Sequence, residues 1–155
     1  MDDVETEQSL KKAKGYALRL FKLRPRSEAE LKAKLAVKGF TLDICSIIVD
    51  KFKVLGFIDD AAFARVWMQG RLKKYGFSRV ARELAQKGIA KEIVTDLWES
   101  VRSDHDEVAV ALAIVERRGR LYRGIEPRKR KKRMMDYLAR RGFSAGTINK
   151  VIREI

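Results

Sequence analysis

The chain has 155 residues, of which 46% are hydrophobic and 36% charged, so it holds enough apolar side chains for a folded core. One cysteine and one histidine exclude an internal disulfide framework and a multi-cysteine zinc or iron–sulfur site. A net charge of +14 favours a polyanionic partner.

The apolar runs along the chain are only a few residues long, which excludes a membrane-spanning helix. The acidic residues 1–5 lack the apolar region of a signal peptide. We therefore expect a cytoplasmic protein with no membrane partner. Residues 1–9 predict an acidic, flexible N-terminal tail.

The next segment predicts three helices, near 11–23, 28–38 and 42–54. Apolar residues in the first follow helical spacing, namely Ala13, Tyr16, Ala17, Leu20 and Phe21. Ser27 and Glu30 form a capping-box pattern at the start of the second helix. Gly39 then suits the left-handed residue that ends this helix, and Thr41 can cap the third.

The same order of signals occurs twice more. Asp59 and Asp60 precede a predicted helix over 60–74, followed by helices near 77–87 and 90–101, with Gly88 between them. Predicted helices near 105–119, 129–141 and 144–154 follow, with Gly142 and Ser144 as stop and start signals. No stretch alternates with period two, so no sheet is expected.

Three segments of the sequence also align with one another. They run over 31–40, 80–89 and 134–143, and each has an apolar residue, then Leu-Ala four residues later, then a basic residue, Gly and an apolar residue. The spacing of about fifty residues suits three helices per repeat. The sequence therefore predicts an all-α, elongated array of three tandem, helix-turn-helix-like repeats over 10–58, 59–103 and 104–155.

Residues that could carry catalysis are few. Asp59 and Asp60 could hold a metal, but helix capping explains them better. His105 lies between two aspartates without a nucleophile motif, and Cys45 lies beside an apolar helix face. We therefore expect no catalytic residue, no cofactor and no metal, and assign structural roles to Ser27, Gly39, Asp59, Asp60, Gly88 and Gly142.

The basic residues are concentrated in three blocks. Residues 11–39 carry ten basic and two acidic side chains. Residues 64–88 carry seven basic side chains and one acidic one, and residues 117–133 carry ten basic side chains and one acidic one. Like charges at helical spacing repel, so a partner that neutralises them is favoured over a merely solvated face. The candidate contact residues are Arg24, Arg26, Lys34, Lys38, Arg71, Lys73, Lys74, Arg79, Arg82, Lys87, Arg117, Arg118, Arg120, Arg123, Arg128, Lys129, Arg130, Lys131, Lys132 and Arg133.

Taken together, the three middle helices carry a net charge of +10, whereas the three third helices carry −1. A helix-turn-helix protein reads bases with the helix that corresponds to the third, so base-specific readout is disfavoured. Aromatic residues such as Tyr75, Phe77 and Tyr122 are few among the basic residues, which disfavours a stacking platform for single strands. The pattern favours a basic stripe along the middle helices.

Several motifs, in order, resemble the RecX family of bacterial RecA modulators over residues 11–155. They are Arg26-Ser27-x-x-Glu30-Leu31-x-x-Lys34-Leu35-x-x-Lys38-Gly39-Phe40, Leu55-Gly56-Phe57-Ile58-Asp59-Asp60-x-x-Phe63-Ala64, residues 71–76, Glu83-Leu84-x-x-Lys87-Gly88-Ile89 and Tyr137-Leu138-x-x-Arg141-Gly142-Phe143-Ser144. Phe77 departs from the pattern, where proline is expected after Gly76.

The resemblance implies a regulator that lies in the groove of the RecA–single-stranded DNA filament. It implies inhibition of the ATPase, strand-exchange and coprotease activities of RecA, in recombination, DNA repair and SOS control. The expected partners are this filament and single-stranded DNA, with double-stranded DNA as a further candidate, and the expected state is a monomer. The alternatives are a general nucleic-acid-binding protein without a recombinase partner and a hydrolase that uses Asp59, Asp60 or His105.

Overall fold

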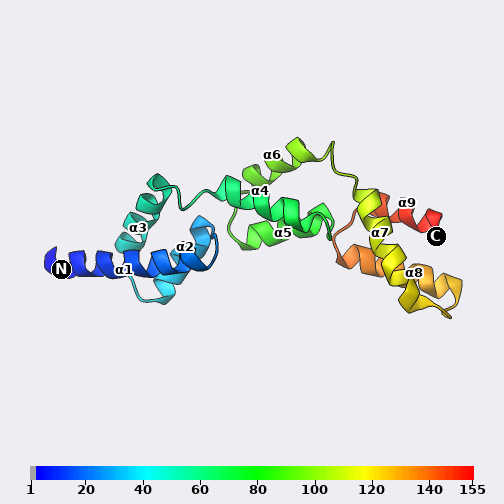
Figure 1. Ribbon diagram of the computed structural model, residues 1–155, viewed down its shortest axis with the longest axis horizontal. Helices are drawn as coiled ribbons and strands as arrows, with labels where there is room; N and C mark the ends of the chain where they lie inside the picture. Colours follow the sequence, from blue (N-terminus) through cyan, green and yellow to red (C-terminus); the bar gives the residue numbers. More distant parts are fainter. Residues whose placement is uncertain (1–2) are drawn as a thin grey trace.

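A computed structural model describes residues 3–155, and over this range the chain consists of helices with no strand. The α-helices are α1 (Asp3–Leu23), α2 (Glu28–Val37), α3 (Leu42–Val54), α4 (Asp60–Arg71), α5 (Phe77–Gln86), α6 (Lys91–Val101), α7 (Glu107–Gly119), α8 (Pro127–Arg140) and α9 (Ala145–Glu154). A short 3-10 helix, η1 (Arg120–Tyr122), follows α7. The predicted all-α array is confirmed, and Figure 1 shows its three groups of helices in an elongated row.

Several element boundaries differ from the sequence predictions: α4 ends at Arg71 instead of residue 74, and α7 begins at Glu107 instead of residue 105. Residues 3–9, predicted as part of a flexible tail, form the first turns of α1, with Asp3 and Glu5 in the first turn, where acidic side chains favour the helix dipole. Residues 1 and 2 of that tail lie outside the described residues. Helix α8 begins at Pro127 instead of residue 129, because proline suits the first helical position and Glu126 caps it.

Side-chain caps begin most of the helices where the sequence placed them. Ser27 and Glu30 form the predicted capping box of α2, and Thr41 and Ser144 accept backbone hydrogen bonds at the starts of α3 and α9. Asp59 caps α4 through the backbone N–H of Ala62. Polar side chains within three residues therefore mark these helix starts.

Each group of three helices has a hydrophobic core of its own. Buried side chains form one cluster in α1–α3, a second in α4–α6 and a third in α7–α9, and the more extensive helix–helix contacts are all made within a group. Leu35, Leu84 and Leu138, which the repeat alignment equates, are each fully buried in their own cluster. We call these groups repeats 1, 2 and 3.

The joint between repeats 1 and 2 is made by the start of α2 and the end of α5. The Ser27 hydroxyl donates to the Lys87 carbonyl, and the Lys87 ammonium lies 3.1 Å from the Glu30 carboxylate. Gly88, at a φ of +74°, lies so close to Ala29 that a Cβ at Gly88 would overlap the Ala29 side chain. Asp60, at the start of repeat 2, accepts from the backbone N–H of Glu28.

The joint between repeats 2 and 3 uses the corresponding parts of the next pair of helices. The Gly76 N–H donates to the Arg141 carbonyl at 2.9 Å, and the Ser78 hydroxyl donates to the Gly142 carbonyl at 3.1 Å. A Cβ at Gly76 would overlap the Gly142 backbone. This close approach explains why residue 76 is a glycine. Helix α5 begins at the next residue, Phe77, which is the residue that departs from the family pattern.

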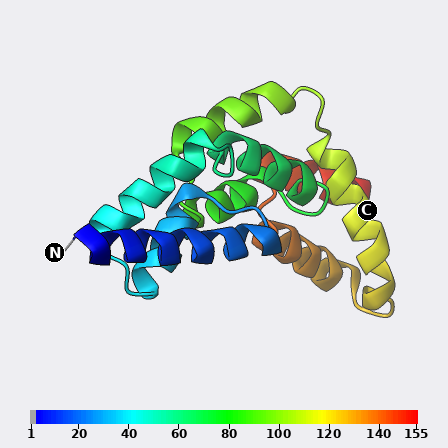
Figure 2. The same cartoon turned by 60° about the vertical axis from the view of Figure 1, so that its left-hand side comes forward.

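As a result, the middle helices α8, α5 and α2 follow one another end to end. The C-terminal end of α8 meets the N-terminal end of α5, whose own C-terminal end meets the start of α2. In Figure 2, turned by 60°, the α4–α6 group again lies between the other two. The negative end of one helix dipole faces the positive end of the next, which favours this arrangement.

The close approach at Gly142 makes a testable prediction. Gly142→Ala is expected to lower the free energy of unfolding by about 1–2 kcal/mol through its positive φ alone. We expect a further loss of stability because the new Cβ would lie 2.6 Å from the Arg79 backbone nitrogen. Gly39→Ala is the matched control, since Gly39 also has a positive φ but no atom within 4 Å of the added Cβ. Urea denaturation measures both, and equal losses would contradict a contribution from the joint.

Candidate nucleic-acid and protein interface

The most basic segment of the chain is the first half of α8. Arg128, Lys129, Lys132 and Arg133 are exposed, whereas Arg130 and Lys131 are half-buried. None of these six side chains forms an ion pair within residues 3–155. Their positive charge is therefore free to attract an anionic partner. We call residues 128–133 the α8 basic run.

Arginine side chains of two repeats converge on Tyr75. The guanidinium groups of Arg71 and Arg79 lie 4.1 and 4.2 Å from the centre of the Tyr75 ring, and that of Arg141 lies at 4.8 Å. Arg71 and Arg79 belong to repeat 2, and Arg141 follows α8 in repeat 3. Such cation–π contacts fix the guanidinium planes against the ring.

A second ring continues this pattern into repeat 3. Arg118 lies 3.8 Å and Arg141 5.0 Å from the centre of the Tyr137 ring. The Arg118 Nε also donates to the Tyr122 hydroxyl at 3.1 Å, and these contacts raise the pKa of Arg118. Together with Lys87, which lies 4.5 Å from the Trp67 ring, the contacts form a row of alternating cations and rings. We call it the cation–aromatic row, which comprises Lys87, Trp67, Arg71, Tyr75, Arg141, Tyr137 and Arg118.

Part of this row is neutralised by Glu83. Its carboxylate accepts from Arg71 at 2.6 and 2.8 Å, from Arg79 at 3.2 Å and from the Trp67 ring nitrogen at 3.1 Å. The hydrogen bond to Arg71 is the main reason that the pKa of Glu83 is lowered. Glu83 therefore holds the repeat 2 cations in place and reduces the net charge that they present.

Glu30 has the corresponding role at the first joint and carries a pH prediction. Burial would raise its pKa, but hydrogen bonds from Arg24, the Ser27 N–H and Lys87 outweigh burial and lower the pKa from 4.5 to about 2. A lowered folded-state pKa stabilises the protein above the unfolded pKa, and that stability is lost as pH falls from about 4.5 to about 2.

Glu30→Gln is expected to remove up to about 3 kcal/mol of stability at neutral pH, reduced by solvent because Arg24 is exposed. The difference between the two proteins should shrink as pH falls through this window. Urea denaturation at a series of pH values measures it. A difference that stays constant down to pH 2 would contradict the assigned carboxylate.

A basic cavity of about 330 Å³ lies between repeats 2 and 3. Its walls come from the segment after α4, from α7 and η1, and from the C-terminal end of α8, and none of the described residues that line it is acidic. The lining residues are Lys73, Lys74, Ile114, Arg117, Arg118, Leu121, Tyr137 and Arg141. The cavity therefore adjoins the cation–aromatic row at Tyr137, and its charge suits an anion.

An apolar cavity of about 510 Å³ lies at the first joint. Phe57, Phe63, Val66 and Trp67 supply apolar walls, and Arg24 and Arg71 are among the charged residues that line it. Phe57 and Val66 are exposed, although both are large hydrophobic residues. Exposed apolar area beside cations suits a contact with another protein.

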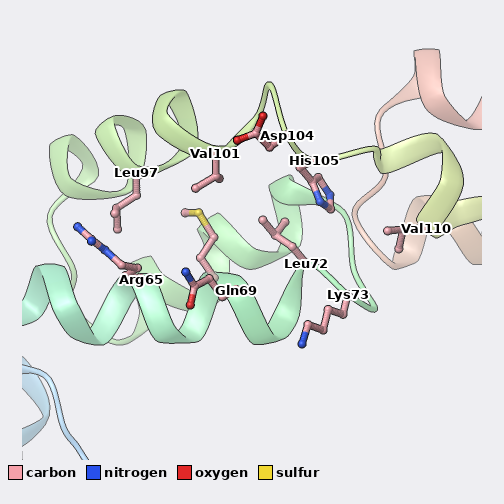
Figure 3. A pocket seen from close by; sticks show the side chains of 10 residues that line it. Arg65, Gln69, Leu72, Lys73, Leu97, Val101, Asp104, His105 and Val110 are labelled. Atoms are coloured by element: carbon pink, nitrogen blue, oxygen red, sulfur yellow. The ribbon is translucent and has the colours of Figure 1, made fainter.

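A third cavity, of about 460 Å³, is shown in Figure 3 between α4, α6 and the segment that leads to α7. Leu72, Leu97 and Val101 give it apolar walls, and Asp104 and His105 lie at the linking segment. The His105 ring packs against Trp98 edge-on at 6.0 Å, and its Nε2 is buried without a hydrogen-bond partner within residues 3–155. The packing gives His105 a structural role at the start of repeat 3.

The other candidate catalytic residues have structural contacts. Asp59 and Asp106 cap their helices, and burial raises the pKa of Asp60, which bonds the Glu28 N–H. Cys45 is buried, and burial raises the pKa of its thiol. Within residues 3–155, no group of three or more His, Cys, Asp or Glu is placed to hold a metal ion. Over the same range, no helix is both long and apolar enough to cross a membrane.

The structure separates the predicted contact residues by their exposure. Arg26 is buried, and its Nε donates to the Leu20 carbonyl, so it stabilises the end of α1 instead of facing a partner. Half-buried are Arg71, Arg79, Lys87, Arg118, Arg130 and Lys131. Exposed are Arg24, Lys34, Lys38, Lys73, Lys74, Arg82, Arg117, Arg120, Arg123, Arg128, Lys129, Lys132 and Arg133.

Sequence reasoning missed the aromatic part of this surface and one central cation. Trp67, within the second basic block, and Tyr137, beyond the third, each pack against cations from other helices. The predicted contact residues omit Arg141, although the repeat alignment equates it with Lys38 and Lys87. The repeat alignment could have predicted the role of Arg141, because equivalent positions in tandem repeats lie at equivalent joints.

Comparisons with known proteins agree along most of the chain. Family models described as the first, second and third three-helix domains of RecX match residues 13–52, 59–96 and 105–152. The regulatory protein RecX of Thermobifida fusca is 34% identical over 92% of this chain and 78% of its own length. That of Streptomyces coelicolor is 31% identical over 94% and 78%.

Two solved structures share the fold. The crystal structure of RecX from Lactobacillus salivarius superposes with a TM-score of 0.82 at 22% identity, over 96% of this chain and 97% of that one. A crystal structure of regulatory protein RecX gives a TM-score of 0.86 at 21% identity, over 100% of this chain and 80% of that one. At these identities the likeness concerns the fold.

Proposed function

The chain belongs to the RecX family of regulatory proteins, and from that premise we propose that it restrains the RecA recombinase by binding along the groove of the RecA–single-stranded DNA filament. It acts by binding, without catalysis, as a monomer in the cytoplasm. Binding lowers the ATPase, strand-exchange and coprotease activities of RecA and so limits recombination, DNA repair and the SOS response.

The end-to-end arrangement of α8, α5 and α2 is the observation that carries this proposal. Three repeats, divided as 10–58, 59–103 and 104–155, present cations from every repeat along one elongated molecule. Several weak contacts on one chain become strong together, because each bound repeat raises the effective concentration of the next. A regular helical filament offers the repeated anionic and protein surfaces that such an array needs.

The apolar cavity at the first joint favours a protein partner in addition to DNA. Its exposed Phe57 and Val66 have little to gain from a phosphate backbone, whereas they can bury area against apolar side chains of RecA. Arg24 and Arg71 beside them are already paired with Glu30 and Glu83, so the proposed contact depends on the apolar side chains. We assign protein contacts mainly to this cavity and DNA contacts mainly to repeat 3.

A general nucleic-acid-binding protein is the second candidate. The observation in its favour is the α8 basic run, which forms no ion pair with any other part of the described chain. The two functions predict different effects of added free DNA on the binding of this protein to RecA. A protein that only competes for DNA is displaced from RecA by added DNA, whereas a filament-bound regulator is retained by its protein contacts.

The deciding experiment is a titration of this protein into RecA that hydrolyses ATP on single-stranded DNA, at near-physiological salt. We expect inhibition at well below one molecule per RecA, which persists when free DNA is added. Inhibition that disappears with added DNA would leave the general nucleic-acid-binding function. A lack of inhibition would contradict the proposal.

A further inference from the structure

The basic cavity between repeats 2 and 3 differs from the cationic parts of repeat 2 and of the first joint. Repeat 2 neutralises Arg71 and Arg79 with Glu83, and the first joint neutralises Lys87 with Glu30. The five cations that line the basic cavity form no ion pair within residues 3–155. They are Lys73, Lys74, Arg117, Arg118 and Arg141.

Two of these cations are held in place before any ligand binds. Arg118 stacks on Tyr137 and bonds the Tyr122 hydroxyl through Nε. Arg141 donates from one terminal nitrogen to the Lys74 carbonyl at 2.9 Å while it contacts both Tyr75 and Tyr137. Each guanidinium has five N–H donors, so both retain donors for an anion. Preorganised donors lower the entropy cost of binding.

The cavity also continues into the α8 basic run. Arg130, Arg133, Tyr137 and Arg141 are spaced three or four residues apart, which places them on one face of α8. The fourteen residues of α8 extend over about 21 Å at 1.5 Å per residue. A linear anion that enters the cavity therefore finds further cations in line, whereas a compact anion reaches only the cavity itself.

We propose that the basic cavity binds a phosphodiester of a nucleic-acid strand, whose backbone continues along α8, and that this phosphate ties repeat 3 to repeat 2. The cavity takes Lys73 and Lys74 from repeat 2 and its other cations from repeat 3, so a bound phosphate bridges the joint. The site gives the proposed filament regulator a direct DNA contact and rests on that function only for its biological setting.

The test uses the double variant Lys74→Ala with Arg117→Ala, because both side chains are exposed. The control is Lys51→Ala with Lys91→Ala, which removes the same charge from exposed positions on α3 and α6 away from the cavity. Binding of a short, labelled single-stranded DNA is measured by fluorescence anisotropy without RecA, over a series of salt concentrations. Unfolding by urea verifies that all the proteins are folded.

We expect the cavity variant to bind this DNA about ten- to thirtyfold more weakly near 0.1 M salt, with a salt dependence reduced by about 1.4 in the log–log slope, as for two lost phosphate contacts. The control should change affinity less than about threefold, through long-range attraction alone. Hydrogen exchange at residues 72–79, which include the Gly76 N–H of the joint, should slow on DNA binding in the parent and much less in the cavity variant.

Three results would overturn the inference. Equal losses in the cavity variant and the control would mean that net charge alone attracts DNA. Competition by polyglutamate as strong as that by unlabelled DNA would assign the cavity to an acidic protein surface. Competition by inorganic phosphate alone, with an unchanged DNA salt slope, would indicate a site for a compact anion. RecA is absent from this DNA-binding assay. A result that overturns the phosphate site would therefore not affect the RecA ATPase experiment that tests the proposed function.

Discussion

Leu84→Ala is expected to lower the free energy of unfolding by about 2–5 kcal/mol. Leu84 lies on α5 and is fully buried in the core of repeat 2. Truncation removes its burial and leaves a cavity that the neighbouring side chains fill only in part. The effect should extend beyond one repeat, because α5 contributes to both joints through Gly76 at its start and Lys87 at its end.

Chemical denaturation of the full chain, followed by circular dichroism, measures this loss. Leu84→Met serves as the volume-conserving control and should cost less than about 1.5 kcal/mol. Leu23→Ala serves as the surface control, because Leu23 is 78% exposed, and it should change stability by less than about 0.5 kcal/mol. A Leu84→Ala effect as small as that of Leu23→Ala would show that the repeat register is wrong.

Reversal of the α8 basic run is the second large effect. Lys129→Glu, Lys132→Glu and Arg133→Glu together are expected to weaken binding to the RecA–DNA filament on the order of a hundredfold near 0.1 M salt, as for three lost phosphate contacts. All three side chains are exposed, a glutamate at position 129 lies in the first turn of α8 where it favours the helix dipole, and the changes reduce repulsion among the remaining cations. Stability should therefore be unchanged or slightly raised. Inhibition of RecA ATP hydrolysis and anisotropy of labelled filaments measure the loss.

The matched control reverses Lys11, Lys51 and Lys91, which changes the net charge by the same amount on α1, α3 and α6. It should retain most of the filament inhibition, because only long-range attraction is reduced. If the α8 variant inhibits RecA as well as the parent does, the α8 basic run is a solvated helix face. If both variants lose inhibition equally, net charge and not position drives binding.

The chemistry of local positions explains why the helices were predictable. A capping side chain such as Ser27 or Thr41 and a helix stop such as Gly39 act within a few residues, so their effect is readable in the sequence. The start of α8 was misplaced by two residues because Glu126 and Pro127 were not recognised as a cap and first residue. The tail prediction overlooked that acidic residues suit the first turn of α1.

The candidate interface was predictable in charge but not in architecture. Exposed cations such as Lys132 lie where a basic block on a helix places them. Arg26 is buried, and its side chain bonds to the end of α1. A count of charges along the sequence cannot predict this burial. A count of aromatic residues within the basic blocks leaves out Tyr137, because Tyr137 meets Arg118 only across helices.

The sequence by itself determined the helices, their caps, the threefold repetition and the family, because each depends on periodicity and on side chains a few residues apart. Only the tertiary structure decided how the repeats join, which cations Glu83 and Glu30 neutralise, and which five cations around the basic cavity have no ion pair within residues 3–155. The joints and the pairing of Glu30 with Lys87 depend on residues more than fifty positions apart, such as Ser27 with Lys87 and Gly76 with Arg141. Their geometry is set by core packing, which brings distant backbone ends into contact.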